Sequence, residues 1–303
     1  MPTRLTQSIP WILALAAVSL SLISPHGSAT LAPWIFLSSA ILLGVPHGAC
    51  DPWIPGWVLH RPSRLPFLLI FFITYLALSA LYLCLWRTYP FPSTIFFLFL
   101  TAWHWGSADA SFEFHPGFRW LCFAIARGSL VMLCPFAFHL PEAWNVVLLM
   151  APEAGPPPSA SLFPVGLIFS LTLQGISKPA WKSWTETLLL LCLFYLTPPL
   201  LSVGIYFMAF HAWRHLLRLA SIRDQFSSAE ITAPWIQSVF RLLLLSCPLT
   251  LATLIFLPSI PALVQTSTNQ NWVGPYLVLL AVLTLPHAIL VGWVDKKAPF
   301  VKS

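Results

Sequence analysis

Long apolar runs separated by short polar segments dominate the chain. A helix needs about 20 apolar residues to cross a bilayer, with a range of roughly 17–25. Clear runs of this kind lie at 31–47, 65–86, 92–108, 119–138, 236–258 and 273–294. Shorter or weaker runs lie at 10–24, 162–176, 185–197 and 199–213. The pattern therefore predicts an all-α, polytopic membrane helical bundle of about ten transmembrane helices.

Two of the shorter runs need a separate argument. Residues 10–24 have the length of a signal-peptide hydrophobic region, but the next span begins almost at once, so we expect a retained helix. The apolar segment 185–215 is too long for one helix. Its double proline, Pro198-Pro199, is where a helix should end and another begin.

The basic residues predict the orientation of the bundle. With ten spans numbered from an N-terminus inside, every lysine and arginine except Arg87 falls on the inner side or its flanks. The outer loop 139–161 carries Glu142 and Glu153 instead. Basic residues accumulate on the cytoplasmic side, so both termini are expected inside. Without a linker or repeat, we expect a single integral membrane domain over 1–303, multi-pass in the inner (plasma) membrane of the cell.

The composition excludes several classes of protein. Hydrophobic residues make up 58% of the chain and charged residues only 8%, against about 25% in an ordinary soluble domain. So few charges could not cover a soluble enzyme or keep a chain disordered. The net charge of +6 is spread in ones and twos and forms no dense patch, so we expect the lipid bilayer and no nucleic acid as a partner.

Four histidines fall at similar depth near the inner ends of even-numbered spans: His47, His104, His211 and His215. His211 and His215 are four residues apart, which places both imidazoles on one helical face, as in helices that chelate a metal ion. A single histidine in a membrane helix is more often an interhelical hydrogen-bonding residue. Four at one depth favour a shared metal site, and His287 in the tenth span is an additional candidate.

Asp51 and Asp109 are the only aspartates among the first 200 residues, and each closely follows a candidate ligand. A metal-bound histidine usually donates its second N–H to a carboxylate or carbonyl, which fixes the ring. Asp51 would reach His47 if that helix continues. Asp109 lies about 140° around the helix from His104, so it would serve a histidine of another helix. A place in the inner headgroup layer is the alternative for both.

Three sequence blocks resemble the signature of the Brp/Blh family of bacterial and archaeal membrane β-carotene 15,15′-dioxygenases. The blocks are Pro46-His47-Gly48-x-x-Asp51, His104-Trp105-Gly106-x-x-Asp109 and His211-x-x-Arg214-His215. Trp105 stands where the family pattern has phenylalanine. The resemblance covers about residues 40–220 and beyond that is limited to hydropathy and Pro286-His287.

The resemblance implies a non-haem Fe²⁺ ion held by His47, His104, His211 and His215. It also implies cleavage of the central double bond of β-carotene, or a related carotenoid, with O₂ to give retinal. Trp105, Phe210 and Tyr206 are the aromatic residues that we expect to line the substrate site, although an aromatic belt would place such residues at the same level.

Two other functions remain open from the residues alone. A membrane transporter could use histidine and aspartate side chains as a proton relay. A membrane haem or redox protein could hold its cofactor between paired histidines. A di-iron desaturase is disfavoured, because such a site takes about eight histidines in several boxes, whereas this chain has nine histidines and only one such box.

Overall fold

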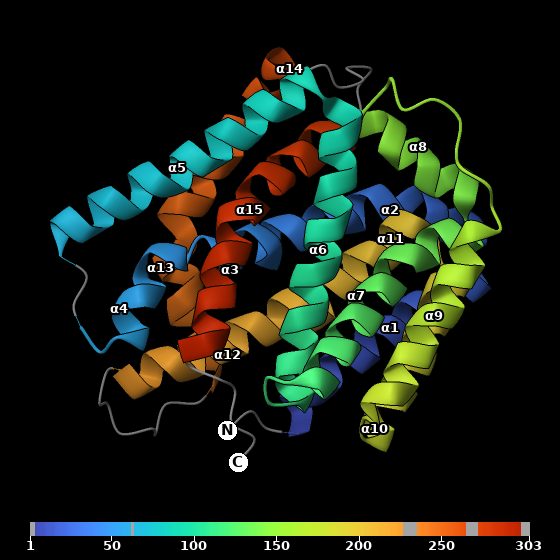
Figure 1. Ribbon diagram of the computed structural model, residues 1–303, viewed down its shortest axis with the longest axis horizontal. Helices are drawn as coiled ribbons and strands as arrows, with labels where there is room; N and C mark the ends of the chain where they lie inside the picture. Colours follow the sequence, from blue (N-terminus) through green and yellow to red (C-terminus); the bar gives the residue numbers. More distant parts are fainter. Residues whose placement is uncertain (1–3, 62–63, 227–234, 265–271, 298–303) are drawn as a thin grey trace.

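The computed structural model describes residues 4–61, 64–226, 235–264 and 272–297, and it is all-helical, with 89% helix. Figure 1 shows α6 and α15 side by side in the middle of the molecule, with α5 and α13 on one side and α7, α8, α9 and α10 on the other. In chain order the helices are α1 (Arg4–Ile23), α2 (Pro25–Ser39), α3 (Val45–Gly48), α4 (Ile54–Val58), α5 (Leu65–Thr88), α6 (Pro90–Glu113), α7 (Phe118–Phe138), α8 (Leu140–Met150), α9 (Leu162–Ser177), α10 (Trp181–Leu196), α11 (Pro199–Ile205), α12 (Trp213–Phe226), α13 (Trp235–Phe256), α14 (Ile260–Leu263) and α15 (Val273–Lys297).

Four short segments connect some of these helices. Two are π-helical, η1 (Ala40–Gly44) and η3 (Tyr206–Ala212), and two are 3₁₀ turns, η2 (Asp51–Trp53) and η4 (Leu257–Ser259). Proline stands in the first turn of α5, α6, α8 and α11, where its missing N–H would have had no partner within the helix. These prolines explain why several helices follow one another with almost no loop.

Five helical segments among the described residues are long and apolar enough to cross a membrane: Pro25–Val58, Leu65–Thr88, Phe118–Phe138, Trp235–Leu263 and Val273–Lys297. The apolar helices α9 and α10 have 16 residues each. At 1.5 Å per residue they reach about 24 Å, less than the hydrocarbon thickness of about 30 Å. Length and composition alone therefore support a membrane protein, with fewer clear spans than the ten predicted.

The double proline divides the chain as predicted. Helix α10 ends at Leu196, and α11 begins at Pro199 after an extended Thr197 and Pro198. The prediction of an outer loop over 139–161 was wrong in part, because α8 (Leu140–Met150) occupies its first half. The missed helix has an apolar face that packs into the core through Trp144, Val147 and Met150. Helix α8 has only 11 residues, so it is too short to be recognised in the sequence as a membrane span.

Helices α6 and α7 approach each other closely through glycine. A Cβ atom on Gly106 would lie 2.0 Å from the carbonyl oxygen of Ala124, and one on Gly128 would lie 1.9 Å from the carbonyl oxygen of Ala102. Small residues at such positions let two helix backbones touch. Because His104 is two residues from Gly106, this contact also fixes the height of His104 in the core.

We expect Gly128→Ala to lower the thermal-unfolding midpoint of the detergent-solubilised protein. The new Cβ would force α6 and α7 apart, and overpacking of this kind costs about 1–3 kcal/mol. Gly292→Ala in α15 is the matched control, because a Cβ there meets nothing within 4 Å. Equal midpoints for the two variants would contradict the close packing of α6 on α7.

Candidate metal centre

Five histidines from five segments of the chain converge in the core. His47 lies on α3, His104 on α6, His211 on η3, His215 on α12 and His287 on α15. All five are buried, with exposed fractions of 3–5%. The structure thus brings together the four histidines singled out in the sequence and His287, the additional candidate.

The imidazole rings lie close together, mostly edge to face, while those of His211 and His215 are nearly parallel. The ring centroid of His104 is 4.7 Å from that of His211 and 4.9 Å from that of His287. His47 is 5.0 Å from His287 and 5.3 Å from His215, centroid to centroid. One ligand atom from each of His47, His104 and His287 lies within 4.8 Å of the other two, so a single ion between them is within reach of all three.

Four ring nitrogens of this group lack a protein partner in the described part of the chain. Among the described residues, the Nε2 atoms of His104, His211, His215 and His287 are buried without a hydrogen bond. A buried polar atom left unpaired costs about 1–3 kcal/mol, and four at one place indicate a shared partner outside the protein. Neutral imidazole is the commonest metal-binding side chain. The donor set therefore fits a transition-metal ion.

Asp51 orients His287. The Nδ1 atom of His287 lies 2.9 and 3.0 Å from the two carboxylate oxygens of Asp51, and the Tyr75 hydroxyl donates to the same carboxylate at 3.0 Å. With its Nδ1–H donated to the carboxylate, His287 keeps Nε2 free to bind an ion. Such carboxylate–histidine pairs make the ligand more basic and hold its ring in place.

The expected contact between Asp51 and His47 is absent from the structure. Helix α3 ends at Gly48, and the chain turns through Ala49 and Cys50 into η2, so the helical spacing from His47 to Asp51 is lost. The Nδ1 atom of His47 instead lies 3.0 Å from the carbonyl oxygen of Leu43 and donates to it. A backbone carbonyl thus fixes the ring of His47.

Both π-helices lie at this site. η1 ends three residues before His47, and η3 contains His211. They contact each other so closely that a Cβ atom on Gly44 would lie 2.4 Å from the ring of Phe207. A π-helical turn inserts one residue into a helix and changes which side chains share a face, and it is frequent at functional sites.

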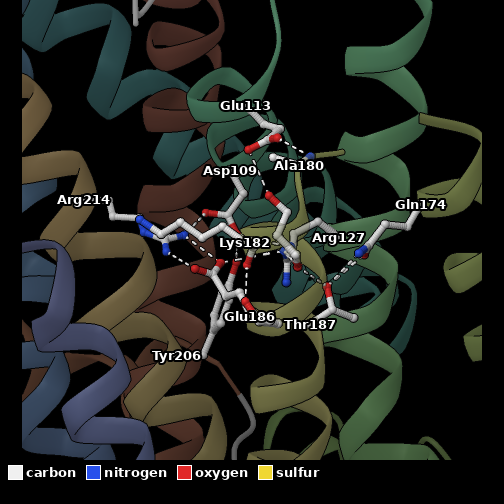
Figure 2. Close-up of polar contacts among 12 residues, drawn as sticks. Asp109, Glu113, Arg127, Gln174, Ala180, Lys182, Glu186, Thr187, Tyr206 and Arg214 are labelled. Atoms are coloured by element: carbon white, nitrogen blue, oxygen red, sulfur yellow. Dashed lines mark hydrogen bonds and ion pairs between the residues drawn. The ribbon is translucent and has the colours of Figure 1, made fainter. Parts of the chain in front are cut away.

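Asp109 belongs to a buried ion cluster beside the histidines, shown in Figure 2. Its carboxylate accepts hydrogen bonds from the Tyr206 hydroxyl at 2.9 Å and from Arg214 at 3.1 Å. Arg214 also donates to both oxygens of Glu186. Arg127 lies 3.7 Å from Asp109 and 3.7 Å from Glu186, so two guanidinium groups face two carboxylates.

The cluster ties four helices to the metal site. Asp109 comes from α6, Arg127 from α7, Glu186 from α10, and Arg214 from α12 between His211 and His215. The expectation that Asp109 serves a histidine was wrong. At 140° from His104 around α6, the Asp109 carboxylate points to Tyr206 and Arg214. These partners lie on η3 and α12, the segments that carry His211 and His215.

An apolar cavity of about 680 Å³ opens onto the rings of His47, His104, His211 and His287. Its volume is in the range of small-molecule binding sites, which are mostly apolar with a few polar groups. Helices α5, α6, α7, α8, α11, α13 and α15 all contribute to its wall. The arrangement suits a long apolar ligand brought against a metal ion.

Of the three aromatic residues expected at the substrate site, Trp105 lines this cavity, but Tyr206 and Phe210 do not. Both are fully buried on the other side of η3, where Tyr206 binds Asp109 and the Arg214 guanidinium lies 5.1 Å from the ring centre of Phe210. Phe207 takes their place in the wall and stacks on Trp105 at 5.7 Å between centroids. The π-helical turn of η3 therefore decides which of its aromatic side chains faces the cavity.

Several residues of the site escaped the sequence analysis. Arg127 and Glu186 are ionisable residues inside predicted spans, and this alone marks a residue as a functional candidate. Tyr75 carried no signal, because one aromatic residue among many in an apolar run is unremarkable in sequence.

Comparison with known proteins gives the family. The model of the family described as "Beta-carotene 15,15'-dioxygenase" matches residues 38–295. The chain belongs to the β-carotene 15,15′-dioxygenase family. The matched region includes all five converging histidines and extends the resemblance from about residue 220 to His287 and beyond.

Two relatives of this family cover nearly the whole chain. One, named "Probable beta-carotene 15,15'-dioxygenase Blh", is from Halobacterium salinarum and is 28% identical, with 94% of this chain and 89% of the relative aligned. The other, named "Beta-carotene 15,15'-dioxygenase", is from an uncultured marine bacterium, 66A03, and is 25% identical, with 86% and 93% aligned. No solved structure matches the chain.

We expect Arg214→Ala to destabilise the protein strongly. The change leaves the carboxylates of Asp109 and Glu186 with Arg127 as their remaining guanidinium, and breaking a buried pair costs about 3–5 kcal/mol. The midpoint of thermal unfolding in detergent measures the effect. Arg61→Ala, at an exposed arginine, is the control and should change stability by less than about 0.5 kcal/mol. A similar small change for Arg214→Ala would show that the cluster does not hold the helices together.

Proposed function

We propose that this chain cleaves β-carotene, or a related carotenoid, at the central double bond with O₂ to give retinal, and that an iron(II) ion serves the reaction. The observation that carries the proposal is the group of five buried imidazoles, four with unpaired Nε2 atoms, of which His47, His104, His211 and His287 line an apolar cavity of about 680 Å³. Family membership favours this enzyme over the transporter and the haem protein that the sequence left open.

His47, His104, His211 and His215 would hold the iron, and His287 would be a further ligand, because its ligand atom lies within 4.8 Å of those of His47 and His104. The bound ion would supply the electrons that make O₂ reactive toward a double bond. An all-histidine set differs from the two-histidine, one-carboxylate sites common among non-haem iron oxygenases. In this site the negative charge would come from the Asp51 carboxylate, which accepts a hydrogen bond from the Nδ1–H of His287.

The rest of the chain positions the substrate and keeps water out. Trp105 and Phe207 stack at an interplanar angle of 24° and offer a flat wall for a conjugated chain beside His211. Cleavage places one oxygen atom of O₂ on each carbon of the broken double bond. No proton has to be taken up or released, in agreement with a cavity wall that is mostly hydrocarbon.

The same proposal includes the setting of the enzyme in the inner (plasma) membrane, with about ten spans and both termini inside. The distribution of basic residues supports this orientation. Residues 227–230 and 265–271, which belong to the inner and outer loops of this scheme, lie outside the described part of the chain. A membrane setting brings the site to the phase in which carotenoids dissolve.

We expect alanine at His47, His104, His211 or His215 to abolish retinal formation and to reduce bound iron. Each ring contributes a donor to a site that acts as a unit, so losing one should disable the rest. Retinal is measured by chromatography of extracts from β-carotene-producing cells, and iron by elemental analysis of the purified protein.

His139→Ala is the control for these variants, since the His139 side chain contacts the backbone carbonyls of Phe194 and Tyr195 outside the cluster. It should keep both iron and activity. Full activity in any one of the four alanine variants would remove that histidine from the proposed ligands.

We expect Asp51→Asn to weaken iron binding or the rate by about 10–100-fold, the usual cost of losing the carboxylate partner of a ligand. The amide no longer carries the charge that makes His287 a stronger donor. Iron affinity, measured by competition with a chelator, tests this directly. Tyr75→Phe keeps the carboxylate and removes only one hydrogen bond to it, so its effect should be smaller. An Asp51→Asn protein with unchanged affinity and rate would leave Asp51 without a role at the metal.

A further inference from the structure

The wall of the cavity is exposed on two helices only, as far as the described residues show. The exposed lining residues are Leu76 and Ala80 on α5 and Ala252 and Phe256 on α13. Leu76 is 59% exposed and Phe256 is 44% exposed, although both also line the cavity. Helix α5 is one of the least buried apolar helices, so its outer face would meet lipid. The cavity therefore has its mouth between α5 and α13.

The opposite end of the cavity is closed. Its lining residues on α7, α8 and α11 are all buried or half-buried, among them Met132, Val146, Met150 and Val203. Helices α6 and α15 lie between this end and the mouth, as Figure 1 shows, and they carry His104 and His287. The metal centre thus faces the middle of a cavity with one open and one closed end.

We propose, on the basis of the proposed function, that the carotenoid enters end-first from the bilayer between α5 and α13. Its leading end stops against α7, α8 and α11, and the depth of this closed end selects the double bond that is cleaved. The helix pair α5–α13 is the substrate entrance, and the wall formed by Met132, Val146 and Val203 is the specificity determinant.

The chemistry of the wall explains why an end stop is needed. Hydrophobic contact is non-directional, so it lets a hydrocarbon slide along its axis. Specific orientation in apolar sites usually comes from a few polar groups, but a hydrocarbon carotenoid offers nothing for them to bind. A conjugated chain is stiff, and the position of its leading end therefore fixes the position of every double bond along it.

The proposal changes which bond breaks but leaves the balance of the reaction untouched. One molecule of O₂ gives one oxygen atom to each carbon of the cleaved double bond, and two carbonyl fragments form, with an aldehyde at each carbon that bears hydrogen and a ketone at each carbon that bears a methyl group. The carbon atoms of the two products always sum to those of the carotenoid. A shallower closed end must therefore give one fragment shorter than retinal and one equally longer.

The closed end is tested with Val146→Phe on α8 and Val203→Phe on α11, each assayed for all cleavage products of β-carotene by chromatography. Both should form carbonyl fragments of unequal length in place of part or all of the retinal. Leu148→Phe, on α8 but outside the cavity wall, is the matched control and should give retinal alone. Two helices are used so that misfolding of one variant does not decide the result. Retinal as the only product of the folded, active variants would overturn the end stop.

The entrance is tested with Ala80→Phe against Ala77→Phe. Both alanines are exposed on α5, but only Ala80 lines the cavity. We expect Ala80→Phe to lower kcat/KM by about tenfold and to slow the uptake of β-carotene from liposomes, with products unchanged, while Ala77→Phe resembles the wild type. Equal uptake by the two variants would overturn the entrance. Uptake needs no chemistry, so a wild-type chain that takes up β-carotene without cleaving it would contradict the proposed function alone.

Discussion

The structure depends on bringing five imidazole rings together in the core, four of them with a buried Nε2 atom that has no protein partner among the described residues. The rings come from α3, α6, η3, α12 and α15. Hydrophobic contact alone does not account for this packing, because each unpaired nitrogen lost its hydrogen bond to water on folding, which costs free energy. The surrounding architecture supplies the restraint. The glycine contact between α6 and α7 sets the height of His104, Asp51 holds His287, and the Leu43 carbonyl holds His47.

The ion cluster beside the histidines has a different part in the same arrangement. Arg127 and Arg214 balance Asp109 and Glu186, so the cluster can cross-link α6, α7, α10 and α12 without adding a net charge near the metal site. Buried ion pairs are weak as a source of stability but specific in geometry. The position of Arg214 between His211 and His215 along the chain links that specificity to the orientation of the two rings.

The sequence predicted much of the fold because its signals are local. Apolar runs of helical length and the double proline at 198–199 predict where helices lie and where one is interrupted, and both agree with the structure. Helix α8 was missed because 11 residues are too few for a span.

Spacing also placed His47, His104, His211 and His215 at one depth, although their role as ligands stays a proposal. The partners of Asp51 and Asp109 could not be predicted, since one depends on a helix that ends at Gly48 and the other on contacts between distant helices. Tyr206 and Phe210 were placed on the wrong side because a π-helical turn shifts the phase of η3 and leaves no signature in the sequence.

The confinement of the exposed cavity wall to α5 and α13 also constrains what happens after the bond is broken. Two aldehydes would then occupy a dead-end passage in single file, one next to the lipid and one behind the metal centre. The outer fragment has to leave first, and the inner fragment can diffuse out only through the space it vacates. Turnover would therefore follow an ordered release, in which the second aldehyde passes the histidines again on its way to the membrane.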